Sequence, residues 1–201
     1  MRGFYFTTDY SLSRRGVYSD VKDALKAGVK TIQYRNKTAD TEILLKEALR
    51  LKKLCKGIKF IINDRVDIAL AVNASGVHLG QEDLSIAAAR KLLGKEKIIG
   101  ITVHNLEEAK QAQKLGADYL GVSPIFSTST KKDAGRPSGV KLIREIKKHV
   151  SLPIVAIGGI NLSNAQEAVS AGADMLCAIS AVLKSRSITS EIERFQQLFS
   201  N

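Results

Sequence analysis

The sequence alternates short runs rich in Val and Ile with longer segments of helical hydrophobic period, and this alternation is its most restrictive feature. Strands are expected at residues 3–6, 31–34, 60–62, 76–79, 98–101, 119–122, 154–157 and 175–179. Helical patterns follow near residues 19–27, 40–55, 65–73, 84–93, 106–115, 139–148, 162–171 and 188–199. Continuous apolar strands separated by helices are typical of a parallel sheet that is covered on both faces.

A repeated phrase supports this count of units. The segments KAGVK (26–30), KLGAD (114–118) and SAGAD (170–174) each place a glycine between a helical pattern and the next strand. Eight such units within 201 residues predict an α/β fold, a (β/α)8 TIM barrel that forms a single catalytic domain over residues 1–201. The alternative is a doubly wound open sheet, but the glycine-rich fingerprint of that fold is absent after the first strand.

The composition narrows the possible partners. Hydrophobic residues make up 44% of the chain, and 31 Lys and Arg against 20 Asp and Glu leave a net charge of +11. The basic residues are spread along helix faces, as in LKEALRLKKLCKGIK (45–59), and do not form a run interleaved with aromatic residues. We therefore expect a solvated basic surface first and an anionic small ligand second, with no nucleic acid as partner.

No apolar run reaches the roughly 18–20 residues that span a bilayer. We expect no contact with a membrane and, because no signal peptide is evident near the first residue, a cytoplasmic location. Cys55 and Cys177 lie far apart and match no metal-ligand spacing, so both are interpreted as small core residues. A homo-oligomer is left open.

Polar residues follow the second, third and fourth strands. Gln33, Arg35 and Lys37 alternate and therefore share one face of an extended segment. The strand at 60–62 runs into Asn63 and Asp64, and Asp83 follows the strand at 76–79. Each carboxylate has a simpler interpretation as a helix cap, but two carboxylates at neighbouring strand ends also suit Mg²⁺.

The remaining strand ends carry hydroxyl groups, a lysine pair and glycines. The segment from 123 to 137 is the longest irregular one, and its composition predicts that it captures phosphate; loops of this length often act as lids. Loops after the seventh and eighth strands of such barrels commonly bind phosphate as well. The candidates on these strand ends are Thr102, Thr128, Ser129, Thr130, Lys131, Gly159 and Ser180.

Together these motifs resemble the thiamine-phosphate synthase family over nearly the whole chain. The motifs are QxRxK at 33–37, NDRVD at 63–67, GVHLGQED at 76–83, PIF at 124–126 followed by TSTKKD at 128–133, and IGGI at 157–160. The resemblance implies a barrel enzyme, a transferase of thiamine biosynthesis. Enzymes of that family join a hydroxymethylpyrimidine diphosphate to a thiazole phosphate and release pyrophosphate, and the resemblance implies the same reaction here.

The resemblance also implies roles for individual residues. Gln33 would contact the pyrimidine, Asp64 and Asp83 would bind Mg²⁺, and Thr102 would stand where the family commonly has serine. The resemblance implies that four residues hold the diphosphate, namely Arg35, Lys37, Asn63 and Lys131. The three cations among them are the implied catalytic residues. Those implied to hold the thiazole phosphate are Thr128, Ser129, Thr130, Gly159, Ile179 and Ser180.

The strand-two motif departs from the family at two positions. Tyr34 and Asn36 replace the usual leucine and glutamate, and we include both among the substrate-binding candidates. The rival functions are a thiazole tautomerase of the same fold, which typically lacks the metal-binding carboxylates, another phosphate-binding isomerase, and a non-catalytic anion-binding protein. The presence of Asp64, Asp83, Lys37 and Lys131 in one chain favours the synthase.

Overall fold

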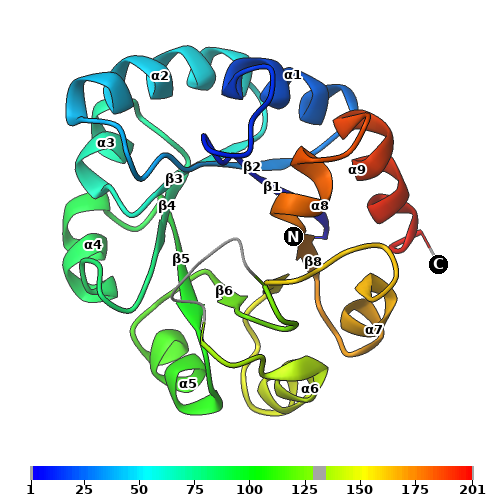
Figure 1. Ribbon diagram of the computed structural model, residues 1–201. Helices are drawn as coiled ribbons and strands as arrows, with labels where there is room; N and C mark the ends of the chain where they lie inside the picture. The colour runs from blue at the N-terminus through cyan, green and yellow to red at the C-terminus, as the bar shows by residue number, and fades with distance from the viewer. Residues whose placement is uncertain (1, 129–134, 201) are drawn as a thin grey trace.

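The computed structural model describes residues 2–128 and 135–200 and confirms a closed (β/α)8 barrel (Figure 1). Parallel pairing runs from each strand to the next and returns from the last to the first, so the sheet has no free edge. The strands are β1 Gly3–Thr7, β2 Thr31–Tyr34, β3 Lys59–Asn63, β4 Gly76–Leu79, β5 Ile98–Val103, β6 Tyr119–Val122, β7 Ile154–Ile157 and β8 Met175–Cys177.

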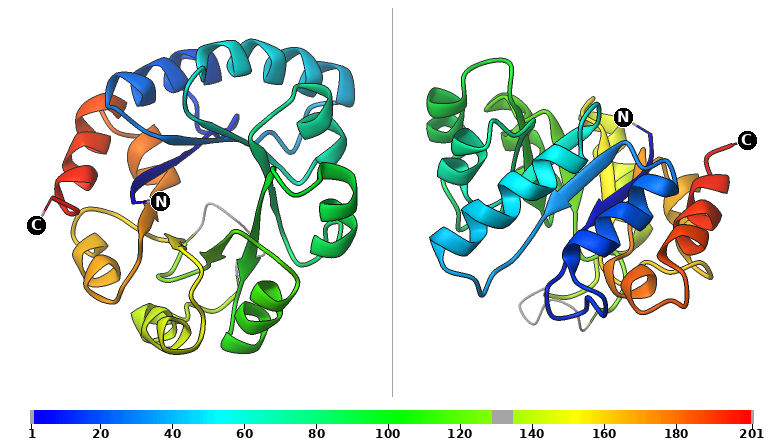
Figure 2. Two further views of the ribbon diagram at one scale, coloured as in Figure 1. Left: turned by 180° about the vertical axis from the view of Figure 1, so that it is seen from behind. Right: turned by 90° about the horizontal axis from the view of Figure 1, so that it is seen from above.

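Helices cover the outer face of this sheet, as both views in Figure 2 show. They are α1 Val17–Lys26, α2 Thr41–Leu54, α3 Val66–Ala71, α4 Ile86–Leu93, α5 Leu106–Lys114, α6 Gly139–His149, α7 Ala165–Ser170, α8 Ile179–Leu183 and α9 Ile188–Gln197. Each longer helix buries one stripe of apolar side chains. In α6, for example, Leu142, Ile143 and Ile146 are buried, while Lys141 and Lys148 are exposed.

The last strand is shorter than the sequence pattern predicts. The expected strand at 175–179 ends at Cys177, and the chain turns at once into the short helix α8. The segment LCAISAVL (176–183) is apolar almost throughout, so its hydrophobic pattern does not distinguish a buried strand from a buried helix. Figure 1 places α8 inside the ring of the other helices, beside β8.

The barrel interior is filled by side chains that differ from those of the outer core. Tyr5, Tyr119, Val155, Met175 and Cys177 form a buried cluster of their own. Space for the Tyr119 ring comes from Gly100 on the neighbouring strand, where an added Cβ would lie 2.0 Å from the ring. The Tyr119 ring therefore depends on the glycine that faces it, and the side chains of the interior cluster are buried.

No helix within the two described ranges is both long enough and apolar enough to cross a bilayer.

Candidate active site

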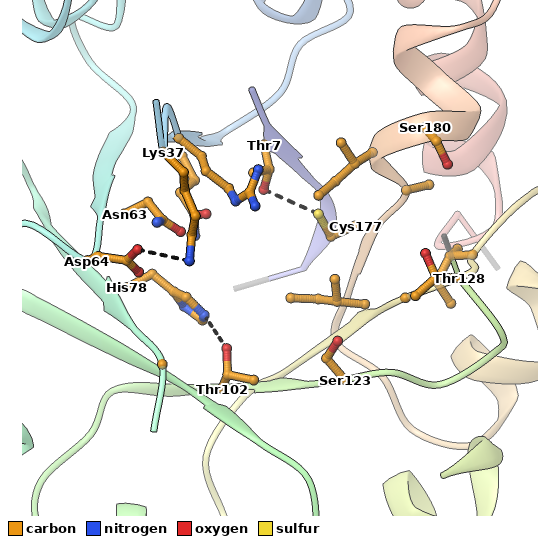
Figure 3. A pocket seen from close by; sticks show the side chains of 18 of the residues that line it. Thr7, Lys37, Asn63, Asp64, His78, Thr102, Ser123, Thr128, Cys177 and Ser180 are labelled. Atoms are coloured by element: carbon orange, nitrogen blue, oxygen red, sulfur yellow. Dashed lines mark hydrogen bonds and ion pairs between the residues drawn. The ribbon is translucent and has the colours of Figure 1, made fainter. Parts of the chain in front are cut away.

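A pocket opens where the carboxyl ends of the strands converge, and its lining comes from all eight strand ends (Figure 3). Two groups of residues face each other across it. The charged side contains Arg35, Lys37, Asn63, Asp64 and Asp83. The neutral side contains Thr128, Gly158, Gly159, Ile179 and Ser180.

The end of β2 divides its side chains between the pocket and the outer core. Gln33, Arg35 and Lys37 line the pocket, as their alternation predicts. Tyr34 and Asn36 are not brought to the pocket. The Tyr34 hydroxyl donates to Glu47 Oε2 of α2 at 2.5 Å, and the Asn36 side chain contacts the same carboxylate. The structure therefore does not bring these two candidates together with the other predicted substrate contacts.

Asp64 and Asp83 both line the pocket, from the ends of β3 and β4. Neither caps a helix. Helix α3 has Arg65 at its N-cap and no side-chain cap, and Ser85 caps α4 through the Ala88 N–H. Asp64 holds a left-handed backbone conformation at φ 61°, which is uncommon for a residue other than glycine. The local backbone is thus strained at the residue whose carboxylate reaches the pocket.

The electrostatics of these carboxylates favour a bound cation. Burial and the neighbouring Asp83 raise the pKa of Asp64, and Lys37 opposes that shift from 3.3 Å. One Asp83 oxygen already accepts the Gly80 N–H at 2.6 Å, which orients that carboxylate. Two neighbouring carboxylates with an incomplete counter-charge fit Mg²⁺, which takes one or two protein carboxylates and fills its other positions with water and phosphate.

A chain of hydrogen bonds forms the floor of the pocket and was not anticipated from the sequence. Gln33 Nε2 donates to the Tyr5 hydroxyl at 2.9 Å, which lies 2.7 Å from the Tyr119 hydroxyl. The Tyr119 hydroxyl is 2.8 Å from His78 Nδ1, and His78 Nε2 is 3.0 Å from the Thr102 hydroxyl. Burial raises the pKa of both tyrosines, so they remain neutral. This chain links two predicted substrate contacts, Gln33 and Thr102, through three buried rings.

The sequence signal for His78 was its position in β4, where it shares the inward face with Gly76 and Gly80. Cys177 is buried in the interior cluster, as expected of a small core residue, and it also lines the pocket. Its thiol lies 3.3 Å from the Thr7 hydroxyl, and burial raises its pKa to about 12. Cys177 therefore stays a neutral thiol and is not a nucleophile at physiological pH.

The neutral side of the pocket is formed largely by the backbone of the glycine turn after β7. Gly158 and Gly159 both have left-handed φ values, 93° and 65°, and pack directly against the segment after β6. A Cβ on Gly159 would lie 2.4 Å from the Ser127 carbonyl oxygen. Thr128 and Ser180 bring hydroxyl groups to this side, opposite Lys37 and Asp64 (Figure 3). Three further candidates, Ser129, Thr130 and Lys131, lie outside the described residues.

A (β/α)8 barrel with a polar, partly charged pocket at the carboxyl ends of its strands defines the class of the protein, an enzyme that acts on small molecules. The sequence model of the thiamine monophosphate synthase family matches residues 4–182. The chain belongs to this family and is a transferase of thiamine biosynthesis.

Individual relatives agree with this assignment. The chain is 51% identical over 193 residues to the thiamine-phosphate synthase of Methanosarcina barkeri, covering 96% of this chain and 88% of the relative. It is 48% identical over 199 residues to that of Chloroflexus aurantiacus, covering 98% and 92%. A solved thiamine phosphate pyrophosphorylase from Pyrococcus furiosus superposes with a TM-score of 0.90 at 39% identity, covering 98% of this chain and 94% of that one.

Proposed function

We propose that this pocket condenses 4-amino-2-methyl-5-(diphosphooxymethyl)pyrimidine with a thiazole phosphate to give thiamine phosphate and pyrophosphate. The observation that carries the proposal is the pairing of a charged side with a neutral side across one pocket. A diphosphate and its metal need full charges, whereas a monophosphate is held well by hydroxyl and N–H dipoles. The whole reaction takes place in this one barrel, which we propose to be a single catalytic domain located in the cytoplasm.

The pyrimidine substrate is assigned to the charged side and the floor. Gln33 would present its amide to the aminopyrimidine ring, because its Nε2 is already committed to Tyr5 and its oxygen can accept from the amine. Arg35, Lys37 and Asn63 would hold the diphosphate together with Lys131, which lies outside the described residues. Thr102 would add a hydroxyl donor, and Asp64 and Asp83 would hold Mg²⁺.

The thiazole phosphate is assigned to the neutral side. Its phosphate would contact the Thr128 and Ser180 hydroxyls and the Gly159 backbone, with Ser129 and Thr130 following in the same segment. Ile179 would pack against the thiazole ring. With the two substrates on facing sides of one pocket, the thiazole nitrogen would approach the pyrimidine methylene carbon, and the pocket would hold both in one reactive orientation.

The reaction breaks the bond between the methylene carbon and the diphosphate oxygen, and the electron pair leaves with pyrophosphate. The thiazole nitrogen then forms the new carbon–nitrogen bond. Bound Mg²⁺ would supply charge stabilisation for the leaving oxygens. Arg35 and Lys37 would hold the same oxygens as their negative charge increases, which lowers the barrier to bond breaking. This route needs no protein nucleophile, in keeping with the raised pKa of the Cys177 thiol.

The direct test is formation of thiamine phosphate from the two purified substrates, with and without a chelator. We expect equimolar thiamine phosphate and pyrophosphate with magnesium, and loss of both products with EDTA. A thiazole tautomerase would instead change the thiazole phosphate alone and ignore the pyrimidine diphosphate. That result, or full activity in EDTA, would contradict the proposal.

A further inference from the structure

Asp9, which follows β1, is a buried carboxylate that the proposed chemistry does not use. It is 5% exposed and does not line the pocket. Its Oδ2 accepts a hydrogen bond from Arg35 Nη1 at 2.6 Å. Its Oδ1 accepts from both the N–H and the hydroxyl of Ser11, at 3.1 and 2.6 Å. Both oxygens are therefore occupied, and the carboxylate has one orientation.

The neighbouring residue holds the main chain of Arg35 in the same way. The Thr8 hydroxyl accepts the Arg35 N–H at 2.8 Å and lies 3.2 Å from the Arg35 carbonyl, to which it donates. The Thr8 N–H also donates to the Gln33 carbonyl at 2.9 Å. Residues 8 and 9 thus hold both the backbone and the guanidinium of one pocket residue, while they stay outside the pocket themselves.

We propose that Asp9 is a positioning residue for the reaction, one that fixes the Arg35 guanidinium so that its other N–H donors face the diphosphate. The inference rests on the proposed function. A guanidinium is a planar fork with five N–H donors, so an anchor on one nitrogen orients the rest. Asp9 also offsets part of the Arg35 charge, which by itself weakens attraction for an anion. Asp9 therefore helps the site by orienting Arg35. If orientation matters more, neutralising Asp9 weakens diphosphate binding; if charge matters more, neutralising Asp9 strengthens it.

Lys37 provides the contrast within the same pocket. Its carboxylate partner, Asp64 at 3.3 Å, lines the pocket, whereas the partner of Arg35 lies behind it. Of these two described cations, Arg35 is the one whose carboxylate partner does not line the pocket, so ligands in the pocket would not contact its anchor.

The test uses Asp9→Asn in the full-length protein, with Ser11→Ala as a milder second variant. An asparagine amide cannot accept from Ser11 and from Arg35 at once, because one of its two arms is a donor. We expect the KM for the pyrimidine diphosphate to rise about tenfold in Asp9→Asn and about threefold in Ser11→Ala. The KM for the thiazole phosphate is expected to stay unchanged, since that substrate is assigned to the opposite side.

The matched control is Asp118→Asn, which breaks another Asp–Arg pair, to Arg90 Nη2 at 2.7 Å. Asp118 precedes β6 and so lies at the opposite end of the barrel. This variant is expected to lower thermal stability and leave both KM values unchanged. If Asp9→Asn fails to fold, Ser11→Ala carries the test, because it keeps the carboxylate and removes one of its anchors.

The affinity for pyrophosphate in the presence of Mg²⁺, measured by titration calorimetry, distinguishes the orienting effect of Asp9 from the effect of its charge. We expect about tenfold weaker binding by Asp9→Asn and weaker binding by Ser11→Ala. Binding that is tighter or unchanged in both variants would overturn the inference, as would equal rises in both KM values. If the wild-type protein neither binds pyrophosphate nor forms thiamine phosphate, the proposed function itself fails, and the two failures are thereby distinguished.

Discussion

The two sides of the pocket, which we propose both bind phosphate groups, differ in the chemistry that they present. The charged side relies on full charges of opposite sign, such as Lys37 and Asp64, set 3.3 Å apart. The neutral side presents hydroxyls and a glycine turn that only a residue without Cβ can form. Charges that stabilise a departing diphosphate must respond to a change in charge during the reaction, whereas a spectator phosphate needs only a fixed shape.

This difference predicts that substitutions on the two sides fail in different ways. On the charged side, losing a side chain should lower turnover and leave the fold intact. On the neutral side, adding a methyl group should damage both local structure and binding of the thiazole phosphate.

The largest effect is expected from Asp64→Ala and Asp83→Ala. Each removes one proposed Mg²⁺ ligand, and we expect kcat to fall about 10³-fold, as for other losses of transition-state charge stabilisation. Steady-state kinetics at saturating magnesium measures this, with circular dichroism to check the fold. The control is Asp67→Ala, which removes a surface carboxylate paired with Arg65 close by. Turnover near the wild-type value in both aspartate variants would remove the metal role.

Next in size is Gly159→Ala on the neutral side. The new Cβ meets the Ser127 carbonyl oxygen at 2.4 Å and sits on a backbone with φ 65°. We expect about 3 kcal/mol lower unfolding free energy and a raised KM for the thiazole phosphate. Gly57→Ala is the control, since φ is 84° there and an added Cβ meets nothing within 4 Å. It should lose about 1 kcal/mol, through backbone strain alone. Equal losses in the two variants would show that the contact is unimportant.

For Asp64→Asn without metal we expect a smaller effect, which is a gain in thermal stability. Burial and Asp83 raise the Asp64 pKa in the folded state, so the native state binds that proton more tightly than the unfolded chain does. Stability is then lost as pH rises through the raised pKa, and the asparagine variant avoids this loss. In EDTA at pH 7 we expect Asp64→Asn to melt roughly 2–4 °C above wild type.

This advantage should shrink as the pH is lowered, because Asp64 becomes protonated in both states. Asp67→Asn serves as the control of opposite sign. The pKa of Asp67 is lowered, mainly by the hydrogen bond from Arg65, so its ionised form favours folding at pH 7. Replacing it by asparagine should therefore not stabilise the protein. Added magnesium should raise the melting temperature of wild type and not of Asp64→Asn. A lower melting temperature for Asp64→Asn in EDTA would refute the electrostatic description of the charged side.

The smallest effect on activity is expected from Tyr34→Phe. Tyr34 lies beside Gln33 in sequence but bonds to Glu47 in the outer core, so its hydroxyl contributes to stability by about 1 kcal/mol. Both KM values should stay within about twofold of wild type. Gln33→Ala, one residue away and facing the pocket, should raise the KM for the pyrimidine diphosphate about tenfold. A larger kinetic effect from Tyr34→Phe than from Gln33→Ala would mean that the face assignment of β2 is misplaced.

Much of this molecule follows from local pattern. The alternation of apolar runs and helical periods predicts all eight strands, because a strand covered on both faces must be apolar along its length. Period-two alternation also places Gln33, Arg35 and Lys37 on one face. The same rule, applied strictly, excludes Tyr34 and Asn36, which entered the prediction only through the family motif.

What local pattern does not contain is the set of partners that barrel closure brings together. Asp9 contacts Arg35 because β1 lies beside β2 in the barrel. Tyr5 contacts Tyr119 because closure of the ring places β6 so that its side chains meet those of β1 in the interior. The helix α8 follows the same principle, since its apolar segment is buried in either conformation and the surroundings select one. The chain alone thus determined its repeated units and the chemical character of its strand ends. Tertiary structure decided which of those groups touch, because contacts between distant segments depend on ring closure and not on neighbouring residues.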